Sequence, residues 1–170
     1  MKSNIVLVGM SGAGKSTLGV LLAKSLGKNF IDTDIVVQQR TGTLLQNYLD
    51  THGIADFLAT EEATVSALSL CDHVIATGGS VIYSQKAMEH LRRDGTVVYL
   101  DLPYEEIASR LGNITARGIV FRNSGDLRSV YEERLPLYRR FADITVRPAG
   151  HDIEWSVNEI LKKLSEGENS

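Results

Sequence analysis

Residues 9–16 constrain the fold of this chain more than any other segment. They read Gly-Met-Ser-Gly-Ala-Gly-Lys-Ser and match the phosphate-loop pattern G-x-x-x-x-G-K-[ST]. The apolar run at residues 5–8 precedes them, and leucines at helical spacing follow between residues 18 and 26. A buried strand, a glycine-rich turn and a helix in this order are the context that such a loop needs.

The chemistry of this loop predicts nucleotide binding. Glycines let the backbone approach phosphate oxygens, and the N-terminus of a helix attracts negative charge. Lys15 is expected to bridge the β- and γ-phosphates, and Ser16 to bind Mg²⁺. A turn that binds nothing gains no structural benefit from a lysine at this point. The loop therefore predicts a nucleoside triphosphate and Mg²⁺ as ligands.

Short apolar runs alternate with helical patterns along the rest of the chain. Further strands are predicted at residues 30–31, 74–76, 96–100 and 144–146. Helices are predicted around residues 63–70, 107–111 and 153–164, where apolar side chains recur at helical spacing. Strands that alternate with helices favour an α/β fold with a parallel sheet.

Composition limits the partners of the protein. A chain of 170 residues is expected to form a single domain, and its net charge of −3 argues against nucleic-acid binding. The longest apolar runs are too short for a membrane span, and the N-terminus does not resemble a signal peptide. The lone Cys71 suggests a reducing compartment. We expect a cytoplasmic monomer that acts on a small molecule.

A phosphate loop alone does not choose a reaction. A GTPase should carry an N-K-x-D motif, which this sequence lacks, and large ATPases usually need a longer chain. The short length favours a compact kinase.

Residues 30–34 read Phe-Ile-Asp-Thr-Asp, and with this segment the chain resembles the shikimate kinase family. The resemblance runs from about Asn4 to Pro148, and its motifs occur in the family's order. They are the phosphate loop, Asp32 and Asp34, Phe57 with Glu61, Thr77-Gly78-Gly79, Arg117, Glu133-Arg134-Leu135-Pro136-Leu137-Tyr138, and Ala142-Asp143. The resemblance implies a three-layer P-loop NTPase fold, in which helices cover both faces of a five-stranded parallel sheet and a mobile lid spans about residues 112–125. It also implies transfer of the ATP γ-phosphate to a hydroxyl of a small polar metabolite, with shikimate as the first choice.

The resemblance also assigns roles to individual residues. Lys15, Asp34 and Arg117 are the implied catalytic residues: Asp34 orients or deprotonates the attacking hydroxyl, and Arg117 stabilises the transferring phosphoryl group. Ser16 and Asp32 are the metal candidates, with Asp32 acting through water. The implied ATP-binding residues are Gly12, Ala13, Gly14, Lys15, Ser16, Thr17, Arg110, Arg117 and Arg147. The implied acceptor-binding positions are Asp34, Leu58, Gly78, Gly79, Ser80 and Arg134.

Simpler interpretations of these residues stay open. Asp32 and Asp34 could cap a helix, and the glycines at 78 and 79 could form a plain turn. Arg117 could be a solvated loop residue, and Arg134 could belong to a surface ion pair within residues 132–134.

Two positions and one lid segment depart from the family pattern. Leu58 stands where the family's F-R-x-x-E places an arginine that grips the substrate carboxylate. Removing one partner of such a buried pair costs about 2–5 kcal/mol. Ser80 replaces the third glycine of G-G-G, and either donates to a substrate hydroxyl or merely tolerates the backbone angle. In the lid, R-P-L-L becomes Arg-Gly-Ile-Val at residues 117–120.

These departures keep other functions in consideration. Arg134 could hold the substrate carboxylate alone, or Arg40 could assist it. The acceptor could instead be a different small hydroxy acid or homoserine. A nucleoside or nucleotide kinase, and a nucleotide-binding protein without shikimate kinase activity, are the further alternatives.

Overall fold

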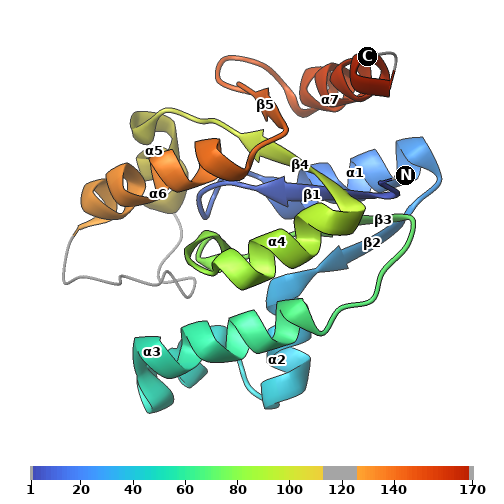
Figure 1. Cartoon of the computed structure of the whole chain (residues 1–170). Helices are drawn as coiled ribbons and strands as arrows, with labels where there is room; N and C mark the ends of the chain where they lie inside the picture. The colour runs from blue at the N-terminus through green and yellow to red at the C-terminus, as the bar shows by residue number, and fades with distance from the viewer. Residues whose placement is uncertain (1, 113–125, 169–170) are drawn as a thin grey trace.

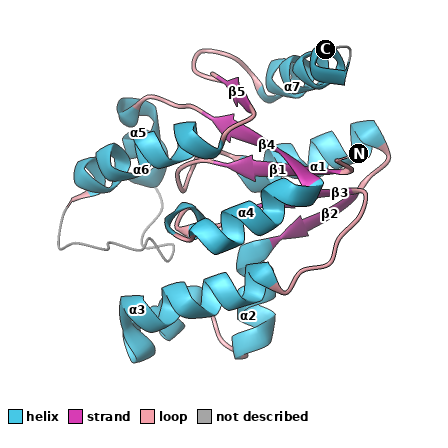
Figure 2. Cartoon of the chain, viewed as in Figure 1, coloured by secondary structure: helices cyan, strands magenta, loops and turns pink. Residues whose placement is uncertain are grey.

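A five-stranded parallel sheet forms the centre of the protein, with the strand order β2-β3-β1-β4-β5. The computed structural model describes residues 2–112 and 126–168. The central strand β1 is buried along its whole length, and its Val6 aligns with Ile75 of β3 and Val97 of β4. The strands are β1 (Asn4–Val8), β2 (Asn29–Asp32), β3 (His73–Ala76), β4 (Gly95–Leu100) and β5 (Ile144–Val146). Because they are parallel, their carboxyl ends meet at one edge of the sheet (Figure 2).

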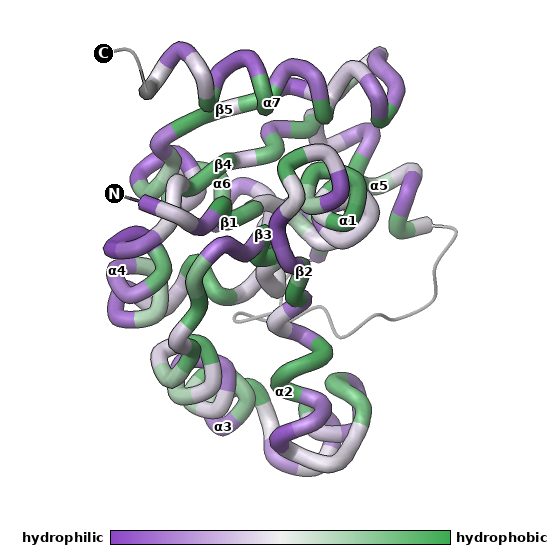
Figure 3. The backbone as a smooth tube through the Cα atoms, turned by 90° about the vertical axis from the view of Figure 1, so that its right-hand side faces the viewer, coloured by the Kyte–Doolittle hydropathy of each residue, from purple (hydrophilic) through white to green (hydrophobic). Residues whose placement is uncertain are grey.

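Helices cover both faces of this sheet, as the alternating sequence pattern predicts (Figures 1 and 3). Helices α1 (Lys15–Leu26) and α7 (Ile153–Glu168) pack together on one face. Helices α4 (Gln85–Asp94) and α6 (Leu127–Phe141) cover the other face, and α5 (Tyr104–Gly112) contacts α6. The result is the predicted three-layer α/β architecture. Within the described residues, no helix is long and apolar enough to cross a membrane.

The helices α2 (Thr33–Thr41) and α3 (Leu45–Ser66) form a lobe beyond strand β2 (Figure 1). This α2–α3 lobe has its own small core, separate from the main core, around the buried Val37 and Phe57. Helix α3 is interrupted at Gly53, whose φ of 82° lies in the left-handed region. A short 3₁₀ helix, η1 (Val81–Tyr83), follows strand β3 and contacts the α2–α3 lobe through α3.

The five predicted strands are confirmed, whereas the helix predicted around residues 63–70 is wrong in extent. It ends at Ser66, with Ala67 as its C-cap, and it begins as early as Leu45. The first half of α3 was not predicted, because the non-helical backbone at Gly53 shifts the spacing of apolar residues between the two halves. Helices α4 and α6 were not predicted, and α6 carries Pro136 in its interior. The predicted lid lies outside the described residues, apart from Gly112 at the end of α5.

Candidate active site

The turn between β1 and α1 has the backbone conformation of a phosphate-binding loop. Gly12 and Gly14 have φ values of 82° and 89°, which residues other than glycine rarely adopt. Gly14 is the N-cap of α1 and has no side chain that could cap the helix. The first amide N–H groups of α1 are therefore available to an anion, and the helix dipole favours negative charge at the same point.

Lys15 lies folded inside this loop. Its Nζ donates to the carbonyl oxygens of Gly9 at 2.7 Å and Met10 at 2.8 Å. Burial lowers the pKa of Lys15 to about 8, an effect that the positive charge of Arg134 reinforces and that Asp34 and Asp32 oppose. The ammonium group is thus held where anionic oxygens would stabilise its charge.

Ser16 and Asp32 meet beside the loop. The Ser16 hydroxyl donates to Asp32 Oδ2 at 2.5 Å. Asp32 Oδ1 accepts from the Asp34 amide at 2.9 Å, so Asp32 also caps α2. The capping interpretation of Asp32 is therefore confirmed, and it coexists with the contact to Ser16.

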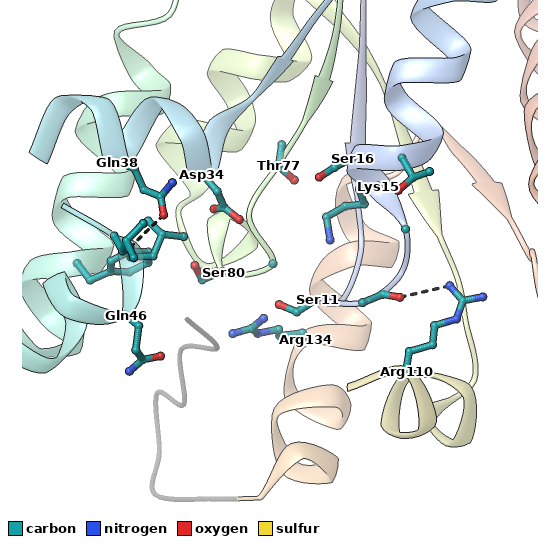
Figure 4. Close-up of a pocket in the computed structure, with 17 residues that line it drawn as sticks. Ser11, Lys15, Ser16, Asp34, Gln38, Gln46, Thr77, Ser80, Arg110 and Arg134 are labelled. Atoms are coloured by element: carbon teal, nitrogen blue, oxygen red, sulfur yellow. Dashed lines mark hydrogen bonds between the residues drawn. The ribbon is translucent and has the colours of Figure 1, made fainter. Parts of the chain in front are cut away.

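A pocket of about 690 Å³ opens at the carboxyl edge of the sheet. Asp34 and Lys15 approach it from opposite walls, and Arg134 lies at its base in the view of Figure 4. Its walls come from the phosphate loop, from the α2–α3 lobe, from the turn after β3, and from helices α5 and α6. The residues that line it are Ser11, Gly12, Gly14, Lys15, Ser16, Thr17, Asp34, Gln38, Leu44, Leu45, Gln46, Phe57, Thr77, Gly79, Ser80, Arg110 and Arg134.

Two carboxylates converge on Gly78 next to this pocket. A Cβ atom at Gly78 would lie 2.5 Å from Asp34 Oδ1 and 2.7 Å from Glu61 Oε1. Burial, with the nearby charge of Asp32, raises the pKa of Asp34 to about 6, against the opposing effect of Lys15. Burial likewise raises the pKa of Glu61 to about 7, with Asp34 contributing. Only glycine leaves room for both acids at this point of the turn.

Arg134 is a buried residue of α6 rather than part of a surface ion pair. Its relative exposure is 1%. Its Nε donates to the Tyr83 hydroxyl at 3.3 Å, and a Cβ at Gly79 would come within 2.7 Å of its Nη1. The Tyr138 hydroxyl donates to the Gly79 carbonyl at 2.7 Å. The interpretation of Arg134 as part of a surface ion pair is thus wrong, and its guanidinium group lines the pocket instead.

The structure brings most of the predicted site residues together, but not all. The residues that line the pocket are Gly12, Gly14, Lys15, Ser16, Thr17, Asp34, Gly79, Ser80, Arg110 and Arg134. Ala13 and Gly78 adjoin lining residues in the sequence, and Asp32 bonds to Ser16, but these three do not line the pocket themselves. Arg110 donates to the Gly12 carbonyl at 3.2 Å and pairs with Glu106.

Two further positions stand apart from the pocket. Leu58 packs in the small core of the α2–α3 lobe and does not line the pocket. Arg147 also lies outside the lining residues; its Nε is 3.4 Å from Asp101 Oδ2 on the exposed surface. Arg117 lies outside the described residues.

Sequence reasoning missed several residues of the pocket wall. Gln38 and Gln46 of the α2–α3 lobe line the pocket, together with Leu44 and Leu45. Gln38 Oε1 accepts from the Leu45 amide at 3.2 Å, which ties α2 to the start of α3. Gln38 was detectable, because it follows Asp34 by one helical turn and so shares its face.

A phosphate loop that faces a carboxylate and a buried arginine across one pocket defines a P-loop kinase of small molecules. Comparisons with known proteins agree. The family model for shikimate kinase matches residues 11–165. Shikimate kinases of Thiobacillus denitrificans and Pseudomonas paraeruginosa are 37% and 39% identical, and the alignments cover 96% and 95% of this chain and 91% and 95% of theirs. The chain belongs to the shikimate kinase family.

A solved structure supports the same assignment. The shikimate kinase of Acinetobacter baumannii, in complex with shikimate, superimposes with a TM-score of 0.90 at 30% identity, and the match covers 99% of this chain and 96% of that one. The predicted family, fold and phosphotransferase activity are therefore confirmed. The alternatives of a nucleoside kinase, a homoserine kinase and an inactive nucleotide-binding protein are not favoured.

Proposed function

We propose that this protein transfers the γ-phosphate of ATP to a hydroxyl of shikimate. The observation that carries the proposal is a single pocket that is lined by the phosphate loop, Asp34 and Arg134. Shikimate is a carboxylic acid with several ring hydroxyls, so it needs both a cation and a hydroxyl-activating group. The relatives of this chain support the same acceptor, since one of them is described in complex with shikimate.

The residues divide the reaction between them. Asp34 accepts the proton of the attacking hydroxyl, whose oxygen forms the new bond to the γ-phosphorus while ADP departs. Lys15 and the first amides of α1 stabilise the negative charge of the phosphate oxygens. Arg134 binds the carboxylate of the acceptor and thereby orients the ring. Catalysis arises mainly from positioning and electrostatics.

The contact between Ser16 and Asp32 fits a magnesium ion. A hydroxyl and a carboxylate are oxygen donors of the kind that Mg²⁺ prefers, and they lie side by side at the start of α1. We infer that these two residues would hold the ion, Asp32 through water. When bound, Mg²⁺ supplies positive charge that screens the phosphates from the attacking oxygen.

The remaining parts of the proposal come from the sequence. Arg117, within a lid at about residues 112–125, is assigned to the transferring phosphoryl group, and Arg110 and Arg147 to the adenine end. Arg110 lines the pocket next to the phosphate loop, which supports its assignment. We infer one kinase domain over residues 1–170, acting as a monomer on a small molecule in the cytoplasm, without nucleic-acid or membrane partners.

An ADP-release assay with shikimate, homoserine, gluconate and nucleosides as acceptors tests this function. We expect ADP release above background with shikimate, dependent on added Mg²⁺. Release with another acceptor but not with shikimate would refute the assignment of the acceptor. Release with none of them, from folded protein that binds ATP, would refute the proposed transfer.

A further inference from the structure

Ser80 occupies the third glycine position of the family motif, yet its backbone does not require glycine. Its φ of −85° and ψ of −11° are ordinary for any residue. The residue is 5% exposed and lines the pocket (Figure 4). Its hydroxyl donates to Glu61 Oε2 at 2.7 Å. The serine is therefore tolerated by the backbone and has a specific hydrogen-bond partner.

Glu61 lies behind this turn in a closed environment. It is 3% exposed, and among the described residues its Oε1 has no hydrogen-bond partner. Within the part of the chain that the structure describes, the charged or titratable groups that act on it are Asp34 of α2 and Arg134 and Tyr138 of α6. Leu58, one turn earlier on α3, packs in the lobe core and offers Glu61 no charge. Ser80 is thus the group that satisfies the Glu61 carboxylate from the pocket side.

The direction of this hydrogen bond sets what Ser80 presents to a ligand. A hydroxyl has one hydrogen and two lone pairs. Because its hydrogen points to Glu61, the oxygen that borders the pocket offers lone pairs. Such an oxygen attracts a donor, such as a hydroxyl of the ligand, and repels a carboxylate. This polarity is the opposite of the expectation that Ser80 donates to a substrate hydroxyl.

We propose that Ser80 is a specificity-determining residue that accepts a hydrogen bond from a non-reacting hydroxyl of the acceptor, and that Glu61 is the positioning residue that holds it in this orientation. The ligand class is a polyhydroxylated carboxylic acid, with Arg134 binding the carboxylate and Ser80 a hydroxyl. This inference rests on the proposed function, because it assumes that the acceptor occupies the pocket lined by Ser80.

Ser80→Ala tests the proposal through acceptor KM. A hydrogen bond of ordinary strength corresponds to about 2- to 12-fold in affinity. We expect Ser80→Ala to raise the KM for shikimate by about this factor and to leave the KM for ATP unchanged. Shikimate analogues that lack one non-reacting hydroxyl identify the partner: for one of them, wild type and Ser80→Ala should have equal KM values.

Ser84→Ala is the matched control. The Ser84 hydroxyl donates to Glu62 Oε2 at 2.6 Å. This serine–glutamate hydrogen bond resembles that of Ser80, but its acceptor is the residue that follows Glu61 on α3. Ser84 does not line the pocket. Its replacement should lower thermal stability, because Ser84 also caps α4, but it should not change the KM for shikimate.

Glu61 variants separate positioning from simple structural support. Glu61→Gln keeps an oxygen that can accept from Ser80, so it should retain the wild-type acceptor KM at neutral pH. Glu61→Ala releases the hydroxyl and should raise acceptor KM as Ser80→Ala does, and the double variant should show no further increase. Additive increases in the double variant would refute the positioning role of Glu61.

The outcomes distinguish this inference from the function on which it rests. If wild type releases ADP with shikimate but Ser80→Ala has the same acceptor KM as Ser84→Ala, the inference fails and the function stands. If Ser80→Ala changes the KM for ATP and for every analogue equally, Ser80 has only a structural role, and the inference also fails. If wild type shows no transfer to shikimate, the proposed function and the inference fail together.

Discussion

Glu61→Gln should gain stability over wild type as the pH rises from acidic to alkaline. Burial raises the pKa of Glu61 from its ordinary value of 4.5 to about 7 in the folded protein. The folded state therefore binds this proton more tightly than the unfolded state does. As the pH rises from about 4.5 to about 7, the unfolded chain ionises first, and wild type loses stability over that window.

The size of the effect follows from the two pKa values. At about 1.4 kcal/mol per unit of pKa, the difference between 4.5 and about 7 corresponds to about 3 kcal/mol. Glutamine does not titrate, so Glu61→Gln avoids this loss. The unfolding free energy of Glu61→Gln minus that of wild type should be about 3 kcal/mol larger at pH 8 than at pH 4.5. For a chain of this length, the change amounts to roughly 6–12 °C in Tm.

Equilibrium urea unfolding of both proteins between pH 4.5 and 8 measures this difference. The experiment is done without nucleotide or acceptor, because ligands that bind the folded state add their own stabilisation. Glu62→Gln serves as the matched control, since Glu62 also accepts a serine hydrogen bond on α3 but is only half-buried. A free-energy difference that stays constant with pH, or shrinks as the pH rises, would refute the reasoning about Glu61.

Three further predictions concern the reaction. Lys15→Ala should abolish ADP release while far-UV circular dichroism stays unchanged; retained transfer would contradict the phosphate-loop assignment. Burial raises the pKa of Asp34 to about 6, and a base must be ionised, so kcat/KM should fall about tenfold per pH unit below pH 6. A profile that is flat from pH 5 to 8 would exclude Asp34 as the base. Leu58→Arg restores the family's arginine on α3, at a position that packs in the lobe core and does not line the pocket. The KM for shikimate should fall if the longer side chain reaches the acceptor carboxylate, and an unchanged KM would show that residue 58 has no contact with the acceptor.

The phosphate loop and the sheet were predictable because their physics is local. Three glycines, a lysine and a serine between an apolar run and a helical pattern specify strand, turn and helix without long-range information. The buried strand β1 lacks alternation because helices cover both of its faces, and this signal is visible in four consecutive apolar residues. Helix α6 was less visible, since its buried face includes Arg134, and Pro136 interrupts its pattern.

The orientation of Ser80 was beyond the sequence because it depends on contacts across the fold. Glu61 and Ser80 are 19 positions apart, and their hydrogen bond forms only when α3 packs beside the turn after β3. The same holds for Arg134, whose burial against Tyr83 requires α6 to lie over η1. The sequence motifs named these residues, but tertiary packing determines which atoms face the pocket.

The separate small core of the α2–α3 lobe bears on how this enzyme could have diverged. Val37 and Phe57 pack with each other and with their neighbours in the lobe, whereas the phosphate loop is anchored in the main core through residues such as Met10, Ala13 and Leu18. Substitutions in one core can accumulate without unsettling the other. The lobe wall that carries Gln38 and Gln46 can therefore diverge during evolution while the phosphate loop stays unchanged.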